Sequence, residues 1–254
     1  MKKTPFLLIF FISINLIMFA QEDKNIRFFN DGNKYYASGK YDDAIENYEK
    51  IINSGFESPE LYFNIANSYY RSNKFTYSIY YYEKAKILLP GDNEIEHNLE
   101  KAELKIQDKI QKIPEFVLIR IIKNIINSES VSFWAYTSLT AFILSLLAII
   151  LFLFSKIRKI KKISFLLGIL IFMFSLTTFV FARVQYSNLM ANNTAIIFTH
   201  SVWVKSSPVE DASDLFNIHE GLKVRIEEES NDWYEIKLSD GKDGWVKKEV
   251  LKII

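Results

Sequence analysis

The chain has 254 residues, of which 49% are apolar and 15% aromatic, and this composition excludes general disorder. Its 31 Lys and Arg residues nearly balance its 30 Asp and Glu residues, which excludes a polycation that binds nucleic acid through bulk charge. Cysteine is absent, so disulfides, thiolate catalysis and cysteine-ligated zinc are excluded as well.

Residues 1–20 have the layout of a signal peptide. Two lysines precede a short apolar run, and Ala20 stands before a charged segment. We expect cleavage after Ala20. Met18 is larger than the small residue usual at that position, which leaves an uncleaved membrane anchor as the alternative.

Residues 21–112 contain an internal repeat. Small and aromatic residues recur at a shift of 34 positions, as in Tyr35 with Tyr69, Gly39 with Asn73, and Tyr48 with Tyr82. Gly39 and Asn73 fall between paired helices and are the residue types that enter the left-handed region most readily. The pattern resembles tetratricopeptide repeats, and the charged helix expected from Asn93 onward would cap them.

Polar residues also recur on the first helix of each unit. In the proteins that this array resembles, these positions line a concave groove and hydrogen-bond an extended peptide. The candidate groove residues are Asn30, Asn33, Asn64, Asn67, Arg71, Asn98 and Lys105. The alternative is a solvated face that tolerates asparagine. Glu94 stands near the place where a clamp for a peptide carboxylate needs a cation, so that clamp is not expected.

Residues 113–130 predict an amphipathic helix. Its polar residues are Arg120, Lys123, Asn124 and Asn127, and their spacing forms one stripe on an otherwise apolar helix. We expect the helix to lie on the surface of a bilayer. Packing against a partner subunit is the alternative.

Residues 131–155 and 163–183 are two long apolar runs. At about 1.5 Å per residue, each covers the ~30 Å hydrocarbon core of a bilayer. Both are rich in Leu, Ile and Phe and leave no polar face for water, so we expect transmembrane helices in place of the core helices of a soluble domain.

The linker between the spans, residues 156–162, sets the expected orientation. It contains Lys156, Arg158, Lys159, Lys161 and Lys162, a higher density of cations than either outer flank has. Cationic loops stay in the cytoplasm. Both soluble regions are then expected on the periplasmic side of the inner membrane, where a cleaved signal peptide would also deliver the first of them.

Residues 195–254 change to short alternating runs separated by turn signals, which predict a small β-barrel. The segment resembles a bacterial SH3-like domain, and the resemblance implies binding of peptide or peptidoglycan through aromatic residues. The available aromatic residues are Trp203, Trp233, Tyr234 and Trp245, and we expect at least half of them to fill the core. Asp240 and Asp243 are interpreted as turn residues and not as calcium ligands.

The sequence lacks the common motifs of catalytic and metal-binding sites. The three histidines are far apart and lack partner carboxylates at metal spacing. The sequence has no phosphate-binding glycine loop, nucleophile elbow or cysteine nucleophile. We therefore expect a protein that is not an enzyme and needs no cofactor or metal.

Taken together, the order of these segments resembles the BatE family of the Bacteroides aerotolerance operon. The fold class implied is a multidomain membrane protein with an α-helical repeat domain, a two-helix transmembrane hairpin and a small all-β SH3-like barrel. The resemblance also implies partner proteins, namely Bat membrane proteins with von Willebrand factor A domains and a MoxR-type AAA+ ATPase system.

Two functional hypotheses follow from the sequence. The first is an inner-membrane scaffold that assembles partner proteins in aerotolerance or envelope stress. The alternative is a protein that binds or senses peptidoglycan through the SH3-like domain. Membrane lipid is an expected partner in both, and nucleic acid in neither.

Overall fold

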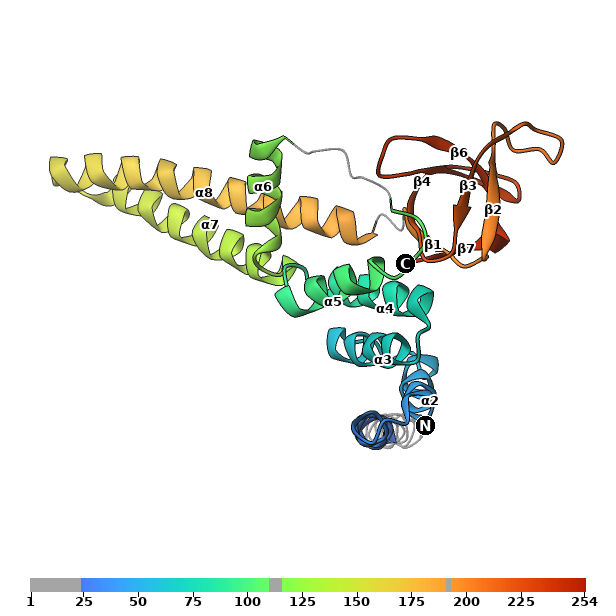
Figure 1. Ribbon diagram of the computed structural model, residues 1–254. Coiled ribbons are helices and arrows are strands. Elements are labelled where there is room, and N and C mark those ends of the chain that lie inside the picture. Colours follow the sequence, from blue (N-terminus) through green and yellow to red (C-terminus); the bar gives the residue numbers. More distant parts are fainter. Residues whose placement is uncertain (1–23, 110–115, 191–192) are drawn as a thin grey trace, which may run out of the picture. The chain divides into compact units, whose positions relative to one another are not determined.

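The computed structural model describes residues 24–109, 116–190 and 193–254 (Figure 1). The predicted signal peptide, residues 1–20, lies outside the described residues. Contacts divide the chain into two compact units. The first combines the N-terminal helices with the C-terminal strands, and the second contains the segment inserted between them.

Antiparallel helix pairs form the N-terminal part of the first unit. Residues 24–37 are helical, and four helices follow: α2 (Tyr41–Asn53), α3 (Pro59–Arg71), α4 (Phe75–Leu88) and α5 (Asn93–Glu103). Ser58 begins α3 by accepting the Leu61 N–H at 3.1 Å, with Pro59 in the first turn. The turn prediction is confirmed, because Gly39 and Asn73 have φ of 76° and 59°.

The predicted repeat packing is also found. Tyr48, Tyr62 and Tyr82 are almost completely buried between the helices. A Cβ atom on Gly32 would lie 2.6 Å from the Tyr48 ring, so the small residue is needed where the first helix meets α2. The 34-residue pattern therefore reports the contacts that hold the helices together.

The capping helix is shorter than the sequence predicts. The charged pattern continues to residue 112, but α5 ends at Glu103. Ile106 leaves the helix and packs with a buried cluster that includes residues of the C-terminal strands. Helix propensity is a weak preference, and these tertiary contacts override it.

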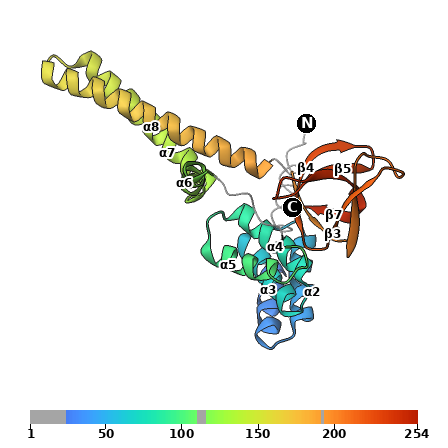
Figure 2. The ribbon, with the colours of Figure 1, turned by 45° about the horizontal axis from the view of Figure 1, so that its top comes forward.

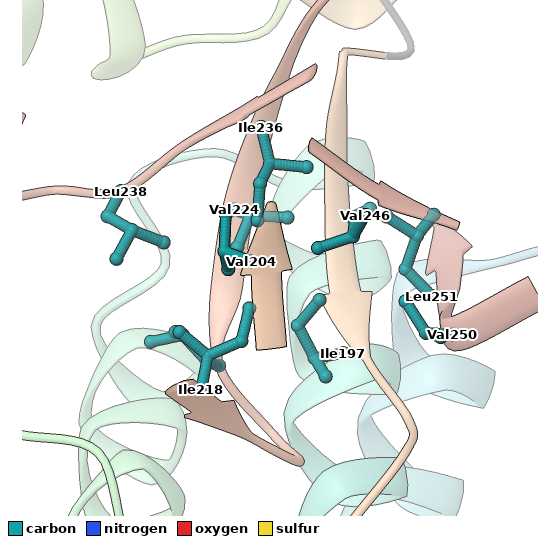
Figure 3. Close-up of a cluster of buried hydrophobic side chains, with 11 residues drawn as sticks. Ile197, Val204, Ile218, Val224, Ile236, Leu238, Val246, Val250 and Leu251 are labelled. Atoms are coloured by element: carbon teal, nitrogen blue, oxygen red, sulfur yellow. The ribbon is translucent and has the colours of Figure 1, made fainter. Parts of the chain in front are cut away.

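Seven antiparallel strands form the C-terminal part of the first unit, called the barrel below. They are β1 (Thr194–Ile197), β2 (Ser201–Lys205), β3 (Asp214–His219), β4 (Lys223–Ser230), β5 (Trp233–Lys237), β6 (Asp243–Lys247) and β7 (Leu251–Ile253). Their order in the sheet is β3-β2-β6-β5-β4-β1-β7. Figure 3 shows the aliphatic core that the strands enclose, with Val204, Ile218, Ile236 and Val246 at 2% exposure or less.

The repeat helices and the barrel share a third core. Ile196 and Ile254 of the barrel are buried in one cluster with Ile79 and Tyr82 of α4 and Leu99 of α5. The prediction of two separate domains for these regions is therefore wrong. They form one unit because α4 and α5 expose apolar side chains that a further repeat would otherwise cover, and the barrel covers them instead.

The second unit contains α6 (Val117–Asn127), α7 (Val131–Phe154) and α8 (Arg158–Met190). Both α7 and α8 are long and apolar enough to cross a membrane. They pack along small or polar side chains: Ser138, Ala141, Ser145 and Ala148 on α7, and Ser164, Ser175, Thr178 and Ala182 on α8. The Ser138 hydroxyl donates to the Ser175 carbonyl at 3.0 Å, and the Ser175 hydroxyl donates to the Ser138 carbonyl at 2.9 Å.

The basic linker differs from its prediction as a loop. Residues 155–157 are the non-helical connection, and α8 already begins at Arg158. The Ser155 hydroxyl accepts the Ile157 N–H at 3.3 Å just before the helix. Lys and Arg have high helix propensity, which explains why the cationic segment extends the second apolar helix.

Candidate partner-binding surfaces

Two similar hydrogen-bonded clusters, called rungs below, connect the first helices of successive repeats. In the first rung, Asn33 Oδ1 accepts the Tyr48 hydroxyl at 2.7 Å and the Asn64 Nδ2 group at 3.2 Å. In the second, Asn67 Oδ1 accepts the Tyr82 hydroxyl and the Asn98 Nδ2 group. The recurrence of asparagine every 34 residues therefore has a structural cause, because each rung joins a tyrosine and two amides.

Each rung also retains hydrogen-bonding capacity. Among the residues that the structure describes, no side-chain hydrogen bond occupies the Nδ2 group of Asn33 or the Oδ1 atom of Asn64. Asn67 and Asn98 repeat this arrangement. A peptide group presents one acceptor and one donor, so each rung matches one peptide group of an extended chain.

The tyrosine hydroxyls remain neutral donors over the physiological range. Burial raises the pKa of Tyr48 and of Tyr82 well above the usual value of 10.0. The rings also pack against aromatic side chains of the first helices, with Phe29 5.9 Å from Tyr48 and Phe63 5.9 Å from Tyr82 between ring centroids. These contacts fix the rungs in place.

The other predicted groove residues do not join the rungs. Asn30 is exposed on the first helix. The Arg71 Nε group donates to the Tyr41 hydroxyl at 3.1 Å, and the guanidinium lies 5.3 Å from the centre of that ring. Lys105 lies in the turn after α5, so it does not occupy the helical position that Arg71 has in the preceding repeat.

The barrel aromatics divide into buried and accessible groups. Trp233 is buried, and Tyr234 packs at the edge of the aliphatic core. Trp245 is half-buried. Trp203 is 54% exposed on β2, opposite Asn217 of β3 in the strand register. Of the four candidates, Trp203 is therefore the side chain best placed to contact a ligand.

Asp240 acts as a turn residue. Its Oδ1 atom accepts the Lys242 N–H at 3.1 Å, and Gly241 follows with φ of 91°. Within the described ranges, no group of three His, Cys, Asp or Glu side chains could hold a metal ion. The turn prediction is confirmed for Asp240, whereas Asp243 is the first residue of β6 and pairs with Lys237.

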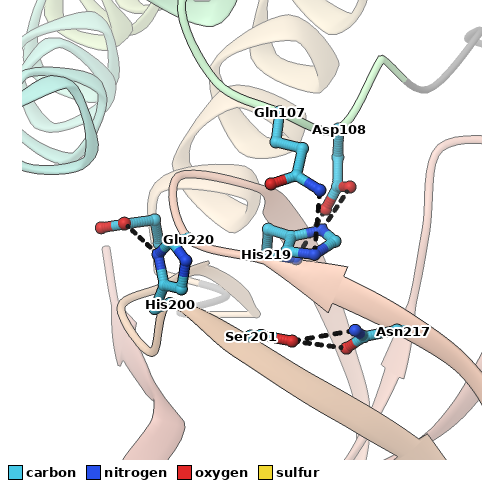
Figure 4. A network of polar contacts seen from close by, with 7 residues as sticks. All are labelled: Gln107, Asp108, His200, Ser201, Asn217, His219 and Glu220. Atoms are coloured by element: carbon cyan, nitrogen blue, oxygen red, sulfur yellow. Dashed lines mark hydrogen bonds and ion pairs between the residues drawn. The ribbon is translucent and has the colours of Figure 1, made fainter.

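A polar network joins the repeats to the barrel and was missed by the sequence analysis (Figure 4). The Asp108 carboxylate accepts the His219 backbone N–H at 2.6 Å and contacts the His219 Nδ1 atom at 2.8 Å. Glu220 contacts His200 through one oxygen and accepts the Thr76 hydroxyl through the other. His219 and Glu220 thus connect the barrel to two separate parts of the repeat region.

A nearly buried ion pair strengthens the same boundary. The Lys223 ammonium lies 2.7 Å from a carboxylate oxygen of Glu83, whose side chain is only 5% exposed. Gly221 permits close approach, since a Cβ atom there would lie 2.4 Å from Ile106. Phe198 contacts Tyr77 and Tyr80 edge to face. These partners are distant in sequence and follow no periodic pattern that could have revealed them.

The five cations that set the predicted orientation lie at the connection between α7 and α8. Lys156 is in the connection, and Arg158, Lys159, Lys161 and Lys162 are in the first turns of α8. All five are exposed. The Lys161 ammonium lies 5.1 Å from the centre of the Phe152 ring.

Comparison with known families agrees with both soluble regions. Residues 32–73 match the family described as TPR repeat, and residues 201–252 match the family described as bacterial SH3 domain. The helical region is TPR-like, and the seven-stranded sheet is consistent with a bacterial SH3 domain. A search of curated proteins finds no match to the chain. The predicted fold class is confirmed in its three parts, namely the helical TPR-like region, the two long apolar helices and the all-β region.

Proposed function

We propose that the chain is a non-enzymatic membrane scaffold whose TPR groove binds an extended segment of a partner protein. The observation that carries this proposal is the pair of rungs, each of which presents a donor and an acceptor beside one another. TPR repeats and bacterial SH3 domains are modules of protein interaction, which agrees with a scaffold.

The membrane placement is supported by the way the first unit is assembled. Its core contains residues from before α7 and from after α8, so both soluble regions occupy one compartment. A hairpin of two spans leaves and re-enters on the same side. The exposed cations at its turn favour a cytoplasmic turn, which supports a periplasmic location for the TPR and SH3 regions.

The partner assignment rests on the order of segments. This order supports a place among the Bat membrane proteins with von Willebrand factor A domains and a MoxR-type ATPase, in aerotolerance or envelope stress. The groove would then hold an extended periplasmic segment of one of these membrane proteins.

Site-specific photocrosslinking tests the groove. A photoreactive side chain at Asn64 or Asn98 is expected to capture a partner protein in intact cells. The matched control replaces Glu46, an exposed residue on α2 away from the rungs. Absence of adducts at both groove positions, or equal adducts at Glu46, would contradict the groove assignment.

A second function is favoured by the exposed Trp203. Bacterial SH3 domains are associated with peptidoglycan binding, and an exposed tryptophan beside Asn217 offers a stacking surface with a polar neighbour. Full-length protein in detergent would sediment with purified sacculi under this hypothesis, and Trp203→Ala would abolish the retention. The isolated barrel is a poor reagent, because it would expose Ile196 and Ile254.

A further inference from the structure

The amphipathic helix α6 leaves most of its apolar surface uncovered. Its polar residues form the stripe defined above, and it contains no acidic residue. Leu118, Ile122 and Ile125 are 62%, 52% and 46% exposed. Ile126 is the only buried residue in this helix, all of which the structure describes.

The arrangement around the helix axis has three sectors. With about 3.6 residues per turn, Leu118, Ile122 and Ile125 lie opposite the polar stripe, and Ile126 lies between these two faces. A helix that rests on a bilayer beside a spanning helix needs these sectors: a polar face toward water, an apolar face toward lipid and a flank against its neighbour.

Two hydrogen bonds fix the end of α6 to the hairpin. The Trp134 indole N–H of α7 donates to the Ile126 carbonyl at 2.9 Å, and the Gln185 amide of α8 donates to the Glu129 carbonyl at 2.9 Å. Trp134 also contacts Phe181 edge to face at 5.2 Å between ring centroids. Tryptophan is typical of the headgroup level, so these contacts hold α6 near that depth.

The orientation of the α6 axis is also consistent with a helix at the headgroup level. Figure 1 shows α6 crossing α7 and α8, and Figure 2 shows it nearly end-on beside them. A helix that crosses spanning helices runs along the plane of the bilayer. Arg120 is a cation of the polar stripe, and its charge matches anionic lipid headgroups.

We propose that α6 lies in the bilayer interface at the outer end of the hairpin, with its apolar face in the acyl region and the Arg120 side chain of its polar stripe on anionic headgroups. This inference rests on insertion of α7 and α8, which is part of the proposed function. It assigns lipid, and not a protein partner, to the uncovered face.

Single-cysteine spin labelling tests the position of α6, because the chain has no native cysteine. Labels at Leu118 and Ile122 probe the apolar face, Asn124 probes the polar stripe, and Leu144 is a span position that is 49% exposed. The full chain is placed in vesicles of phosphatidylcholine with phosphatidylglycerol. Oxygen collects in the hydrocarbon region, and a nickel chelate stays in water.

The ratio of oxygen to nickel collisions is expected to be severalfold higher at positions 118 and 122 than at 124. Exclusion of both probes at 118 and 122 would indicate a protein cover and overturn the inference. Nickel access at 118 and 122 equal to that at 124 would also overturn it. Nickel access at 144 would instead show that the hairpin is not inserted, and the membrane placement would fail with it.

The contact between the polar stripe and anionic headgroups is tested by changing the lipid composition of the vesicles. With the label at Leu118, the collision ratio is expected to rise when phosphatidylglycerol is added to phosphatidylcholine. The substitution Arg120→Gln should reduce this rise while leaving the ratio at Leu144 unchanged. An equal rise in the Arg120→Gln variant would overturn the assignment of this side chain to anionic lipid.

Discussion

At the residue scale, the pairing of Glu83 with Lys223 has the most direct energetic consequence. Glu83 lies in α4, is nearly inaccessible to solvent and has the Lys223 ammonium 2.7 Å away. Breaking a buried pair is costly because the remaining charge loses its partner without regaining water. The pair therefore adds an ionic contact to the apolar core that joins the barrel to the repeats.

We expect Lys223→Met to destabilise the first unit by about 2 to 3 kcal/mol, somewhat less than a fully buried pair would lose because Lys223 is 39% exposed. Urea unfolding of the full chain in detergent measures this change. The matched control is Glu83→Gln with Lys223→Met, which should recover most of the loss. Equal instability of the single and double variants would show that the uncompensated charge is not the cause.

At the element scale, the repeat helices depend on buried tyrosines. Tyr48, Tyr62, Tyr69 and Tyr82 are at most 5% exposed, and burial is the main cause that raises the pKa of each. Glu57 and Glu49 raise the pKa of Tyr62 and Tyr69 further by accepting their hydroxyl hydrogens. Folding therefore favours the neutral phenol at all four positions.

The stability of the first unit should fall as the pH rises above about 10. Below that pH the tyrosines are neutral in both states; above it the unfolded chain loses protons that the folded chain keeps. Each tyrosine then costs about 1.4 kcal/mol per pH unit. Urea unfolding at about pH 8 and about pH 10.5 measures the slope, and Tyr48→Phe should reduce it. A slope unaffected by this substitution would contradict the assignment.

The hairpin depends on small residues where α7 meets α8. A Cβ atom on Gly168 would lie 3.4 Å from the Ala148 Cβ atom, in van der Waals contact, so we expect a side chain that extends beyond Cβ to push the two helices apart. Oxidative crosslinking of Ser138→Cys with Ser175→Cys should be efficient, because each hydroxyl reaches the opposite carbonyl. Adding Gly168→Leu should reduce the yield of this crosslink. The control substitution Leu144→Ile, at an exposed position of α7, should leave the yield unchanged. An equal loss of yield with both substitutions would contradict the packing of α7 against α8 at Gly168.

The positions of most helices and turns could be predicted from local sequence patterns. Gly39 and Asn73 marked the repeat turns because their positive φ is a local requirement. The ends of α5 and α8 were predicted less well. Ile106 leaves its helix for a tertiary contact, and the cations from Arg158 onward join a helix where composition suggested a loop. The first effect depends on a contact with distant residues, whereas the second follows from the helix propensity of Lys and Arg, which the prediction of a linker left out.

At the scale of the whole molecule, the main finding is that the TPR and SH3 regions form one unit. Asp108 and His219 are 111 positions apart, and Glu83 and Lys223 are 140 apart. Such single contacts leave no periodic signal in a sequence. The groove asparagines were predicted because they repeat, but the tyrosine that completes each rung was seen only as a packing residue.

A shared core also restricts membrane topology. The unit can form only if the chain before α7 and the chain after α8 meet in the same compartment. A structure with one soluble region in the cytoplasm and the other in the periplasm would leave Ile196, Ile254 and Glu83 without their partners. On the proposed membrane placement, the cations beside the hairpin turn would decide which compartment receives the unit.

Thiol labelling of single cysteines in intact cells tests this central claim most directly. Ser38→Cys reports on the repeats, Ser239→Cys on the barrel and Ser155→Cys on the hairpin turn. A reagent that does not cross the inner membrane should label positions 38 and 239 before lysis and position 155 only afterwards. Labelling of position 155 alone before lysis would reverse the orientation, and labelling of only one of positions 38 and 239 would contradict a single periplasmic unit.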